Sequence, residues 1–238
     1  MAMGIFQIAD LIVKMDPQSD PLLENSIAYG IDTNTAADVD IVLTDDMRAR
    51  LAAQHPEVPS NVMEYLYTGS WFYHKLLSFQ GFMLHASAVV YEGQAYLFSA
   101  PSGTGKSTHT GLWQEYFGTD HAFILNDDKP ALRLTADGWM AYGTPFSGKA
   151  NLSRNIGVPL KGICFLERGL YNEISPMPEK NAIQNLMFQT VRPRDAADME
   201  LLLQLIEKII DSIPVFQMQC TISPDAARVA YEAMSKSK

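Results

Sequence analysis

The sequence predicts an α/β protein built on a mixed β-sheet. Three observations lead to this prediction: strand-like runs occur on both sides of residue 80, a glycine-rich loop separates a strand-like run from a helical run, and amphipathic helical runs follow later in the chain. Of the 238 residues, 47% are hydrophobic and 19% are charged, which is ordinary globular composition and sufficient for a sizeable core.

Residues 1–80 are expected to form an N-terminal region of strands and helices. Three strand-like runs, IFQIADLIVKM, SIAYGI and DVDIVL, are separated by turn residues. Residues 44–53 and 61–80 have helical spacing, and the second run carries an aromatic stripe that we interpret as core. No motif in this region identifies a function, and we assign it to the selection of an acceptor.

Residues 81–238 are expected to form the main α/β unit. Two strands follow Gly81, and then come the glycine-rich loop, a helix over residues 109–117 and the strand AFILN. Further elements are expected at residues 131–134, 163–166 and 195–213, in VFQMQ, and in a last helix with Ser223 as N-cap and Pro224 in its first turn.

Charge and composition exclude several classes of function. The net charge is −9 and the acidic residues are scattered, which disfavours a nucleic-acid surface or an anionic membrane as partner. No apolar run approaches the roughly 18 residues of a membrane span, and MAMGIFQIAD lacks the features of a secretory signal. Cys164 and Cys220 fit no metal or redox spacing and are expected to be buried thiols. We therefore expect a cytoplasmic protein.

The strongest motif is the loop Ala100-Pro-Ser-Gly-Thr-Gly-Lys-Ser-Thr108, which matches the second part of a Walker A loop. In such loops glycines turn successive N–H groups towards phosphate oxygens, the lysine reaches the β- and γ-phosphates, and the serine hydroxyl ligates a metal ion. The strict pattern has glycine where this chain has Ala100, so that position should have negative φ. The expected ATP-binding residues are Ser102, Gly103, Thr104, Gly105, Lys106, Ser107 and Thr108.

The segment before the loop predicts a β-hairpin. LHASAVVY and QAYLFS flank Glu92-Gly93, and a two-residue turn there makes facing residue numbers add up to 185. Tyr91 would then face Gln94, and His85 would face Ala100 at the beginning of the loop. His85 is therefore a candidate functional residue.

A second motif, Phe123-Ile-Leu-Asn-Asp-Asp-Lys-Pro130, places paired carboxylates at the end of an apolar strand. Mg²⁺, with Mn²⁺ as an alternative, prefers oxygen ligands, and a second carboxylate can accept a proton from an attacking hydroxyl. We favour Asp128 as metal ligand and Asp127 as base, although the pattern leaves the assignment open. Without the glycine-rich loop the same segment would be interpreted as a surface turn.

Together these three blocks resemble the P-loop family of HPr kinase/phosphorylase and ATP-dependent phosphoenolpyruvate carboxykinase. His85-Ala-Ser-Ala looks like the strand before the loop, Ser102-Gly-Thr-Gly-Lys-Ser like the kinase loop, and Asn126-Asp-Asp like the paired-aspartate block. The resemblance covers residues 84–130 and implies a shared mixed-sheet kinase core within residues 81–238. By this resemblance Lys106 and Ser107 handle phosphates and metal, while His85 supports the metal or the catalytic acid.

A downstream glycine-containing segment, Gly143 to Arg154, is similar to segments in small bacterial relatives of these kinases. Lys149 or Arg154 could offset charge on the transferred phosphoryl group, and a solvated loop is the alternative interpretation. The chain is far shorter than a carboxykinase and has no convincing copy of the phosphorylase signature loop. We therefore expect a one-way kinase.

The expected reaction is transfer of the γ-phosphoryl group of ATP to a hydroxyl acceptor, serine of a peptide or protein, with a small-metabolite kinase as the main variant. A nucleotide-dependent switch or binding module without an acceptor is the alternative from another class. The paired acids distinguish these hypotheses, because a switch needs one acid for the metal, whereas the extra carboxylate and His85 suit activation of an alcohol.

Overall fold

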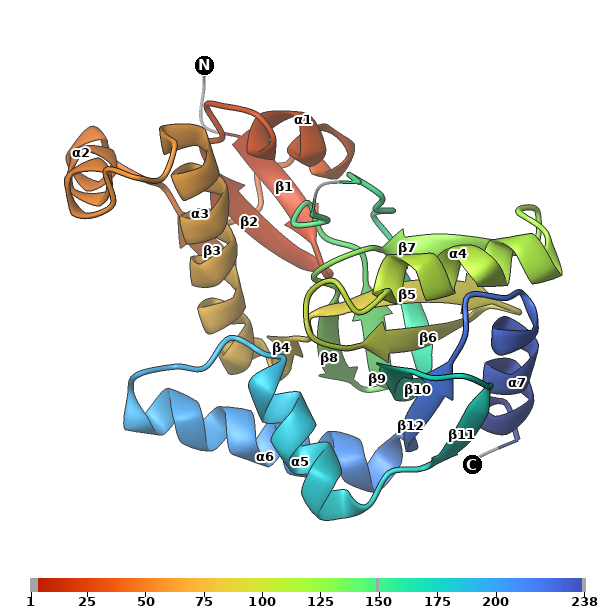
Figure 1. Ribbon diagram of the computed structural model, residues 1–238. Helices are drawn as coiled ribbons and strands as arrows, with labels where there is room; N and C mark the ends of the chain where they lie inside the picture. The colour runs from red at the N-terminus through yellow and green to blue at the C-terminus, as the bar shows by residue number, and fades with distance from the viewer. Residues whose placement is uncertain (1–3, 149, 237–238) are drawn as a thin grey trace.

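A small sheet near the N-terminus and a larger mixed sheet covered by helices make up the structure (Figure 1). This computed structural model describes residues 4–148 and 150–236. The strands are β1 (Gly4–Ile8), β2 (Leu11–Met15), β3 (Val39–Ile41), β4 (Gly81–Met83), β5 (Ala86–Tyr91), β6 (Gln94–Ser99), β7 (Ala122–Asn126), β8 (Ala131–Thr135), β9 (Gly138–Tyr142), β10 (Gly157–Arg168), β11 (Glu173–Pro176) and β12 (Val215–Cys220). The helices are α1 (Leu22–Ser26), α2 (Asp45–Gln54), α3 (Ser60–Leu76), α4 (Lys106–Phe117), α5 (Glu179–Phe188), α6 (Ala196–Ser212) and α7 (Asp225–Met234), with the short 3-10 helices η1 (Ile27–Tyr29) and η2 (Leu77–Phe79). The predicted α/β class with a mixed sheet is confirmed.

In the small sheet, β1 and β2 form an antiparallel hairpin and β3 runs parallel to β2. DVDIVL contains β3 as predicted, whereas the run IFQIADLIVKM forms two strands, β1 and β2, joined by a turn at Ala9 and Asp10. The prediction for SIAYGI is wrong, because Ser26 ends α1 and the next three residues form η1. Short apolar runs fit helix and strand equally well by periodicity. In this segment the only strand-like pairing described is an isolated bridge between Phe6 and Gly30.

The two helices predicted in residues 44–80 are confirmed. Thr44 caps α2, since its side chain accepts a hydrogen bond from the backbone N–H of Met47 at 3.3 Å. In α3, Tyr65, Phe72 and Leu76 are buried in a cluster that also includes residues of β8, β9 and the loop after β9. The aromatic stripe is therefore core, as expected.

Within the described residues the larger sheet has nine strands, with the path β4-β8-β9-β10-β6-β5-β7, and with β12 beside β10 and β11 beside β12. β10 is antiparallel to β9 but parallel to β6 and β12, so the sheet is mixed. The beginning of β10 pairs with β9 and its end with β12, and its register against β6 shifts between Leu160 and Gly162. This irregularity accompanies the curl of the sheet (Figure 1).

The hairpin of β5 and β6 has the predicted register. Glu92 and Gly93 have φ values of 50° and 73°, as a two-residue turn with left-handed geometry requires. Tyr91 pairs with Gln94, and Ala86 pairs with Ser99. His85 and Ala100 therefore follow on the two sides where the ladder ends, and the Ser99 hydroxyl donates to the carbonyl of His85 at 2.9 Å.

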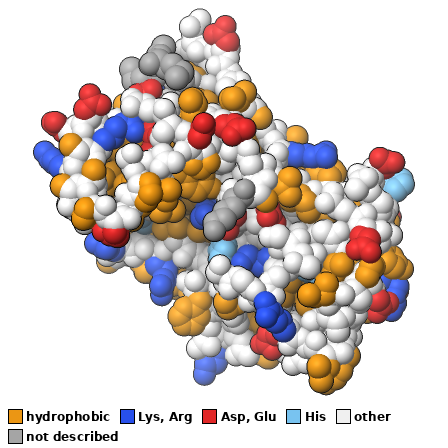
Figure 2. Space-filling model, turned by 45° about the horizontal axis from the view of Figure 1, so that its top comes forward, with side chains coloured by type: hydrophobic (Ala, Val, Ile, Leu, Met, Phe, Trp, Pro, Cys, Tyr) orange, Lys and Arg blue, Asp and Glu red, His pale blue; other side chains and the backbone are white. Residues whose placement is uncertain are grey.

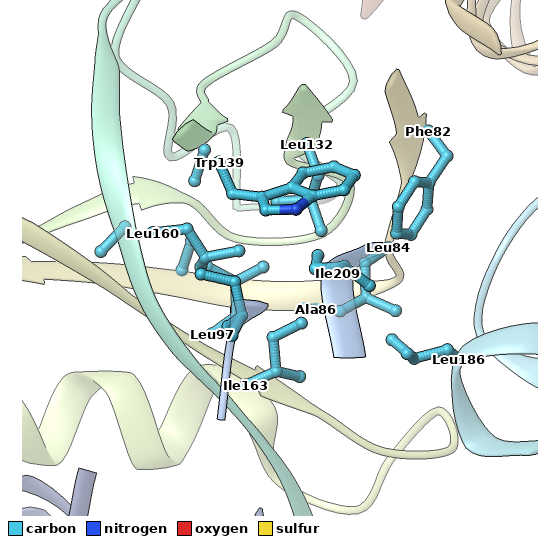
Figure 3. Packing of buried hydrophobic residues seen from close by; sticks show 14 of the residues in the cluster. Phe82, Leu84, Ala86, Leu97, Leu132, Trp139, Leu160, Ile163, Leu186 and Ile209 are labelled. Atoms are coloured by element: carbon cyan, nitrogen blue, oxygen red, sulfur yellow. The ribbon is translucent and has the colours of Figure 1, made fainter. Parts of the chain in front are cut away.

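Two hydrophobic clusters cover the two faces of the larger sheet. One contains Trp139, Leu160 and Ile163 of the sheet together with Leu186 of α5 and Ile209 of α6 (Figure 3). The other lies between the opposite face and the helices α4 and α7. Because helices cover both faces, the ends of the strands and their loops are the parts of this sheet that can present functional groups.

Several elements differ from the predictions. LHASAVVY pairs with β6 only from Ala86 onward. The three residues before this segment form a separate short strand, β4, which pairs with β8. β9, β11 and α5 were not predicted. The N-cap prediction is one residue off: α7 begins at Asp225 after Pro224, and Ser223 contributes its carbonyl rather than its side chain.

Both cysteines lie in strands as expected. Cys164 is buried and Cys220 half-buried, and burial raises the pKa of both thiols, which keeps them protonated at neutral pH. Over residues 4–148 and 150–236, no helix combines the length and apolar character needed to cross a membrane.

Candidate functional site

The glycine-rich loop connects the end of β6 to the beginning of α4. Gly103 and Gly105 have φ values of 79° and 123°, which side chains rarely allow, and a Cβ at either position would meet open space. Positive φ, rather than crowding, is thus the reason for glycine here. Ala100 does not have a positive φ, so alanine is tolerated where the strict pattern has glycine.

Lys106, the first residue of α4, points back into the loop. Its side chain is largely buried, with 8% of the residue exposed, and its Nζ donates to the carbonyl of Ala100 at 3.0 Å. Burial lowers the pKa of Lys106, while the nearby carboxylates of Asp128 and Asp127 raise it. Ser107 is exposed beside it. The loop thus holds a cation and a hydroxyl at the N-terminus of a helix, the arrangement that suits an anionic ligand.

The turn after β7 is built around Asn126. The side-chain oxygen of Asn126 accepts from the backbone N–H groups of Asp128 and Lys129 at 3.1 and 2.8 Å, and its amide nitrogen donates to the carbonyl of Thr144 at 2.9 Å. Asn126 is fully buried and Asp127 is only 9% exposed. This turn is therefore not the solvated surface turn that its composition alone would allow.

Asp127 faces the helix that follows the loop. Its Oδ1 accepts a hydrogen bond from the hydroxyl of Ser87 at 2.7 Å. That hydroxyl accepts a hydrogen bond from the hydroxyl of Thr110 at 2.7 Å, and the Thr110 oxygen lies 3.2 Å from the carbonyl of Ser107. A chain of hydroxyl groups therefore connects the first acid to the beginning of α4.

Asp128 faces the opposite side, where its carboxylate contacts the ring of His85 and the ammonium group of Lys129. The Nε2 atom of His85 lies 3.2 Å from Asp128 Oδ1, and Lys129 Nζ contacts the other oxygen. Burial acts to raise the pKa of Asp128, but the hydrogen bonds from His85 and Lys129 outweigh it and lower the pKa to about 2. The ring of His85 is held from behind by Gln189, whose Oε1 lies 3.0 Å from Nδ1.

The segment after β9 closes over the acidic turn. A Cβ on Gly148 would lie 2.8 Å from the Cβ of Asp128, so only glycine permits this approach. The backbone N–H of Gly148 donates to the hydroxyl of Tyr65 at 3.1 Å, and the hydroxyl of Tyr73 donates to the carbonyl of Lys129 at 2.5 Å. Helix α3 of the N-terminal region therefore supports the acidic turn directly.

The two downstream cations that the sequence singled out do not join this group. Lys149 lies outside the described residues. Arg154 is exposed, and its guanidinium lies 4.0 Å from the ring centroid of Phe123, well before the end of β7. The structure therefore brings together the loop, His85, Asp127 and Asp128, but not Arg154.

Sequence reasoning did not single out several residues of this site. Ser87 lies two positions after His85 in the quoted strand, so alternation along a strand could have indicated it. Lys129 stands within the acidic motif itself. Gln189 gave no signal, because the helix before it was not predicted.

The donor set suits a hard cation shared with phosphates rather than a metal held by protein alone. Among the residues that the structure describes, no group of three or more His, Cys, Asp or Glu could hold a metal ion. Mg²⁺ next to a nucleotide usually takes only one or two protein ligands and completes its shell with phosphate and water oxygens. The exposed hydroxyl of Ser107 and the ionised carboxylate of Asp128 fit that requirement, and they would serve Mn²⁺ equally.

Two clefts flank the loop. One, of 740 Å³, lies between the loop, the end of β10 and α5, and Gln189 belongs to its wall. The other, of 550 Å³, lies between the beginning of α4 and the turns that follow β10 and β12. Arg168 stands between them and donates to the loop carbonyls of Gly103 and Thr104 at 2.6 and 3.2 Å. Figure 2 shows a hollowed face in whose middle cationic, acidic and histidine side chains gather.

A protein-family model described as SynChlorMet cassette protein ScmC matches residues 57–225. The match covers more than half of the chain and includes the loop, both aspartates, His85 and the segment up to Arg154. No curated protein matches the chain.

Proposed function

The chain belongs to the ScmC family of SynChlorMet cassette proteins, and we propose that it is an ATP-dependent kinase with a P-loop core of the HPr kinase type. The acceptor in this proposal is a hydroxyl group, serine of a peptide or protein. One observation carries the proposal: the glycine-rich loop places a buried lysine at the same edge of the sheet as two carboxylates with different partners. Phosphate binding alone would not need the second carboxylate.

The proposed division of work follows the contacts of each side chain. The N–H groups of residues 102–108 cradle the phosphates, and Lys106 leaves the Ala100 carbonyl to reach the β- and γ-phosphates. Mg²⁺, which Ser107 and Asp128 would hold together with phosphate oxygens, offsets the negative charge that the phosphates carry. The low pKa of Asp128 keeps this carboxylate ionised for metal binding. His85 fixes the orientation of the same carboxylate.

Asp127 is the proposed proton acceptor. The acceptor oxygen bonds to the γ-phosphorus while the bond from that phosphorus to the β–γ bridging oxygen breaks. The bonding electrons leave with ADP, and the hydroxyl proton passes to the carboxylate of Asp127. Ser87 holds one oxygen of this carboxylate at 2.7 Å, which leaves its second oxygen for the proton. Arg154 could act on the phosphoryl group only after leaving Phe123, so the main cationic contact falls to Lys106.

The direct test is transfer of label from γ-labelled ATP in the presence of Mg²⁺ and an extract from the source of the protein. We expect acid-stable label in the protein or peptide fraction, released as phosphoserine by hydrolysis. Label in a small metabolite would support a kinase but contradict the peptide acceptor. Label released only as inorganic phosphate would contradict acceptor phosphorylation and favour the nucleotide-dependent switch.

A pair of glycine variants tests the binding loop. Gly105→Ala puts a side chain on a residue with φ of 123°, which should distort the loop and remove most of the rise in melting temperature caused by Mg-ATP. Gly111→Ala is the matched control, because Gly111 lies inside α4 where an added Cβ meets nothing within 4 Å. This control should keep the rise and gain up to about 1 kcal/mol of stability. An equal response of the two variants to Mg-ATP would contradict the assignment.

A further inference from the structure

The 550 Å³ cleft beside α4 has an apolar wall that the protein leaves open to solvent. Leu112 and Cys220 belong to its lining, and Ile222, in the turn after β12, is 84% exposed although it lines the same cleft. The neighbouring turn after β10 contributes Gly169 to the lining and then carries Leu170, which is 93% exposed. Large apolar residues gathered around one cleft indicate a surface that a ligand covers.

An unsatisfied polar group lies in the same wall. His109, in the first turn of α4, is 2% exposed and lines the cleft. Its Nε2 accepts from the indole N–H of Trp113 at 3.4 Å, so in the neutral ring the proton is on Nδ1. Nδ1 is buried and has no partner among the described residues. A buried donor without a partner is costly, so this position of α4 is less well satisfied than the rest of the helix core.

The orientation of the phosphates selects this cleft rather than the larger one. In loops of this kind the N–H groups cradle the α- and β-phosphates while the lysine reaches the β- and γ-phosphates. The groups proposed to act on the γ-phosphate include His85, and its ring and its backbone N–H both bond to Gln189, which lines the larger cleft. In-line transfer places the acceptor and the departing ADP on opposite sides of the γ-phosphorus. The acceptor then enters from the Gln189 side.

The geometry points to the cleft formed by Thr108, Leu112, Gly169, Cys220 and Ile222 as the site of the nucleoside of ATP, with the base packed against Ile222. This inference rests on the proposed function, since it takes the loop to be a phosphate site. It assigns the larger cleft between the loop and α5 to the acceptor. The turns after β10 and β12 are fixed to each other, because the side-chain oxygen of Asn172 accepts from the N–H and the hydroxyl of Thr221 at 2.9 and 3.1 Å.

The test compares a ligand that has a nucleoside with one that has only the phosphates. Affinities of Mg-ATP and of magnesium tripolyphosphate are measured by calorimetry for the wild type, Ile222→Ser and Ile27→Ser. Ile27 is 73% exposed in the N-terminal region and serves as the matched control for an exposed isoleucine. Because Ile222 is exposed in the free protein, its replacement should leave the fold intact.

We expect the wild type to bind Mg-ATP more tightly than tripolyphosphate. Ile222→Ser should weaken Mg-ATP by about tenfold and leave tripolyphosphate unchanged, whereas Ile27→Ser should change neither affinity. Equal affinity of the wild type for both ligands, or unchanged Mg-ATP binding by Ile222→Ser, would overturn the nucleoside site while leaving the phosphate loop in place. If neither ligand binds the wild type, the proposed function itself fails.

Discussion

Replacing Lys106 should abolish most of the stabilisation of this protein by Mg-ATP. A ligand that binds only the folded state adds about 2.7 kcal/mol to the unfolding free energy at a concentration of 100 times its Kd. The Nζ atom of Lys106 lies inside the loop, 3.0 Å from the Ala100 carbonyl, whereas Arg168 reaches the loop carbonyls of Gly103 and Thr104 from the end of β10. Without Lys106 the triphosphate loses its main charged contact, and the ATP-induced rise in melting temperature should largely disappear.

Two variants separate binding from folding in this experiment. Lys106→Met keeps the apolar stem that is buried beside the loop, so its melting temperature without ligand should stay closer to wild type than that of Lys106→Ala. Lys208→Ala removes a cation from α6, where Nζ bonds only to the exposed side chain of Gln80 among the contacts described, and should keep the full response to Mg-ATP. An unchanged response in Lys106→Met would show that the loop does not bind ATP through this lysine.

The sequence was most informative where local chemistry alone decides the structure. A two-residue turn at Glu92-Gly93 fixes the register of the hairpin, because strand pairing counts outward from the turn. Gly103 and Gly105 have the positive φ values that glycine allows, and Thr44, a residue type common at helix N-caps, caps α2. From the register of the hairpin, His85 could be placed beside the beginning of the loop from the sequence alone.

Features set by distant packing could not be predicted in the same way. SIAYGI forms η1 because Tyr29 is buried in the N-terminal cluster while Ile27 points to solvent, and no local pattern specifies that choice. The cation predicted to assist transfer, Arg154, lies over Phe123, since β7 and the segment after β9 run side by side. Gln189 reaches His85 only because the segment after α5 passes the beginning of β5.

The different partners of the two acids also could not be predicted from their adjacency. Successive residues after a strand point to different sides, and here Asp127 meets Ser87 while Asp128 meets His85 and Lys129. That separation gives the two carboxylates distinct environments, which is the condition for distinct roles in proton transfer and metal binding.

Asp127→Asn and Asp128→Asn should both stop phosphoryl transfer but should affect ATP binding differently. The asparagine oxygen at position 127 can still accept the hydrogen bond from Ser87, so the fold and the affinity for Mg-ATP should stay near wild type. Transfer should fall by about 10²- to 10⁴-fold, the usual contribution of a general base. Asp128→Asn removes the charge that His85 and Lys129 now face, together with the proposed metal ligand.

For Asp128→Asn we expect a loss of ATP affinity that appears only when Mg²⁺ is present. Without Mg²⁺ this variant should bind ATP at least as tightly as wild type, because a negative charge facing the phosphates is gone. Affinity with and without Mg²⁺, thermal melting, and transfer to the acceptor found by labelling are measured for both variants and for Asp120→Asn. Asp120 is exposed in the turn before β7 and provides the control. Exchanged phenotypes would reverse the assignment of base and metal ligand, whereas wild-type transfer in both variants would reduce the acidic pair to a structural turn and refute the kinase proposal.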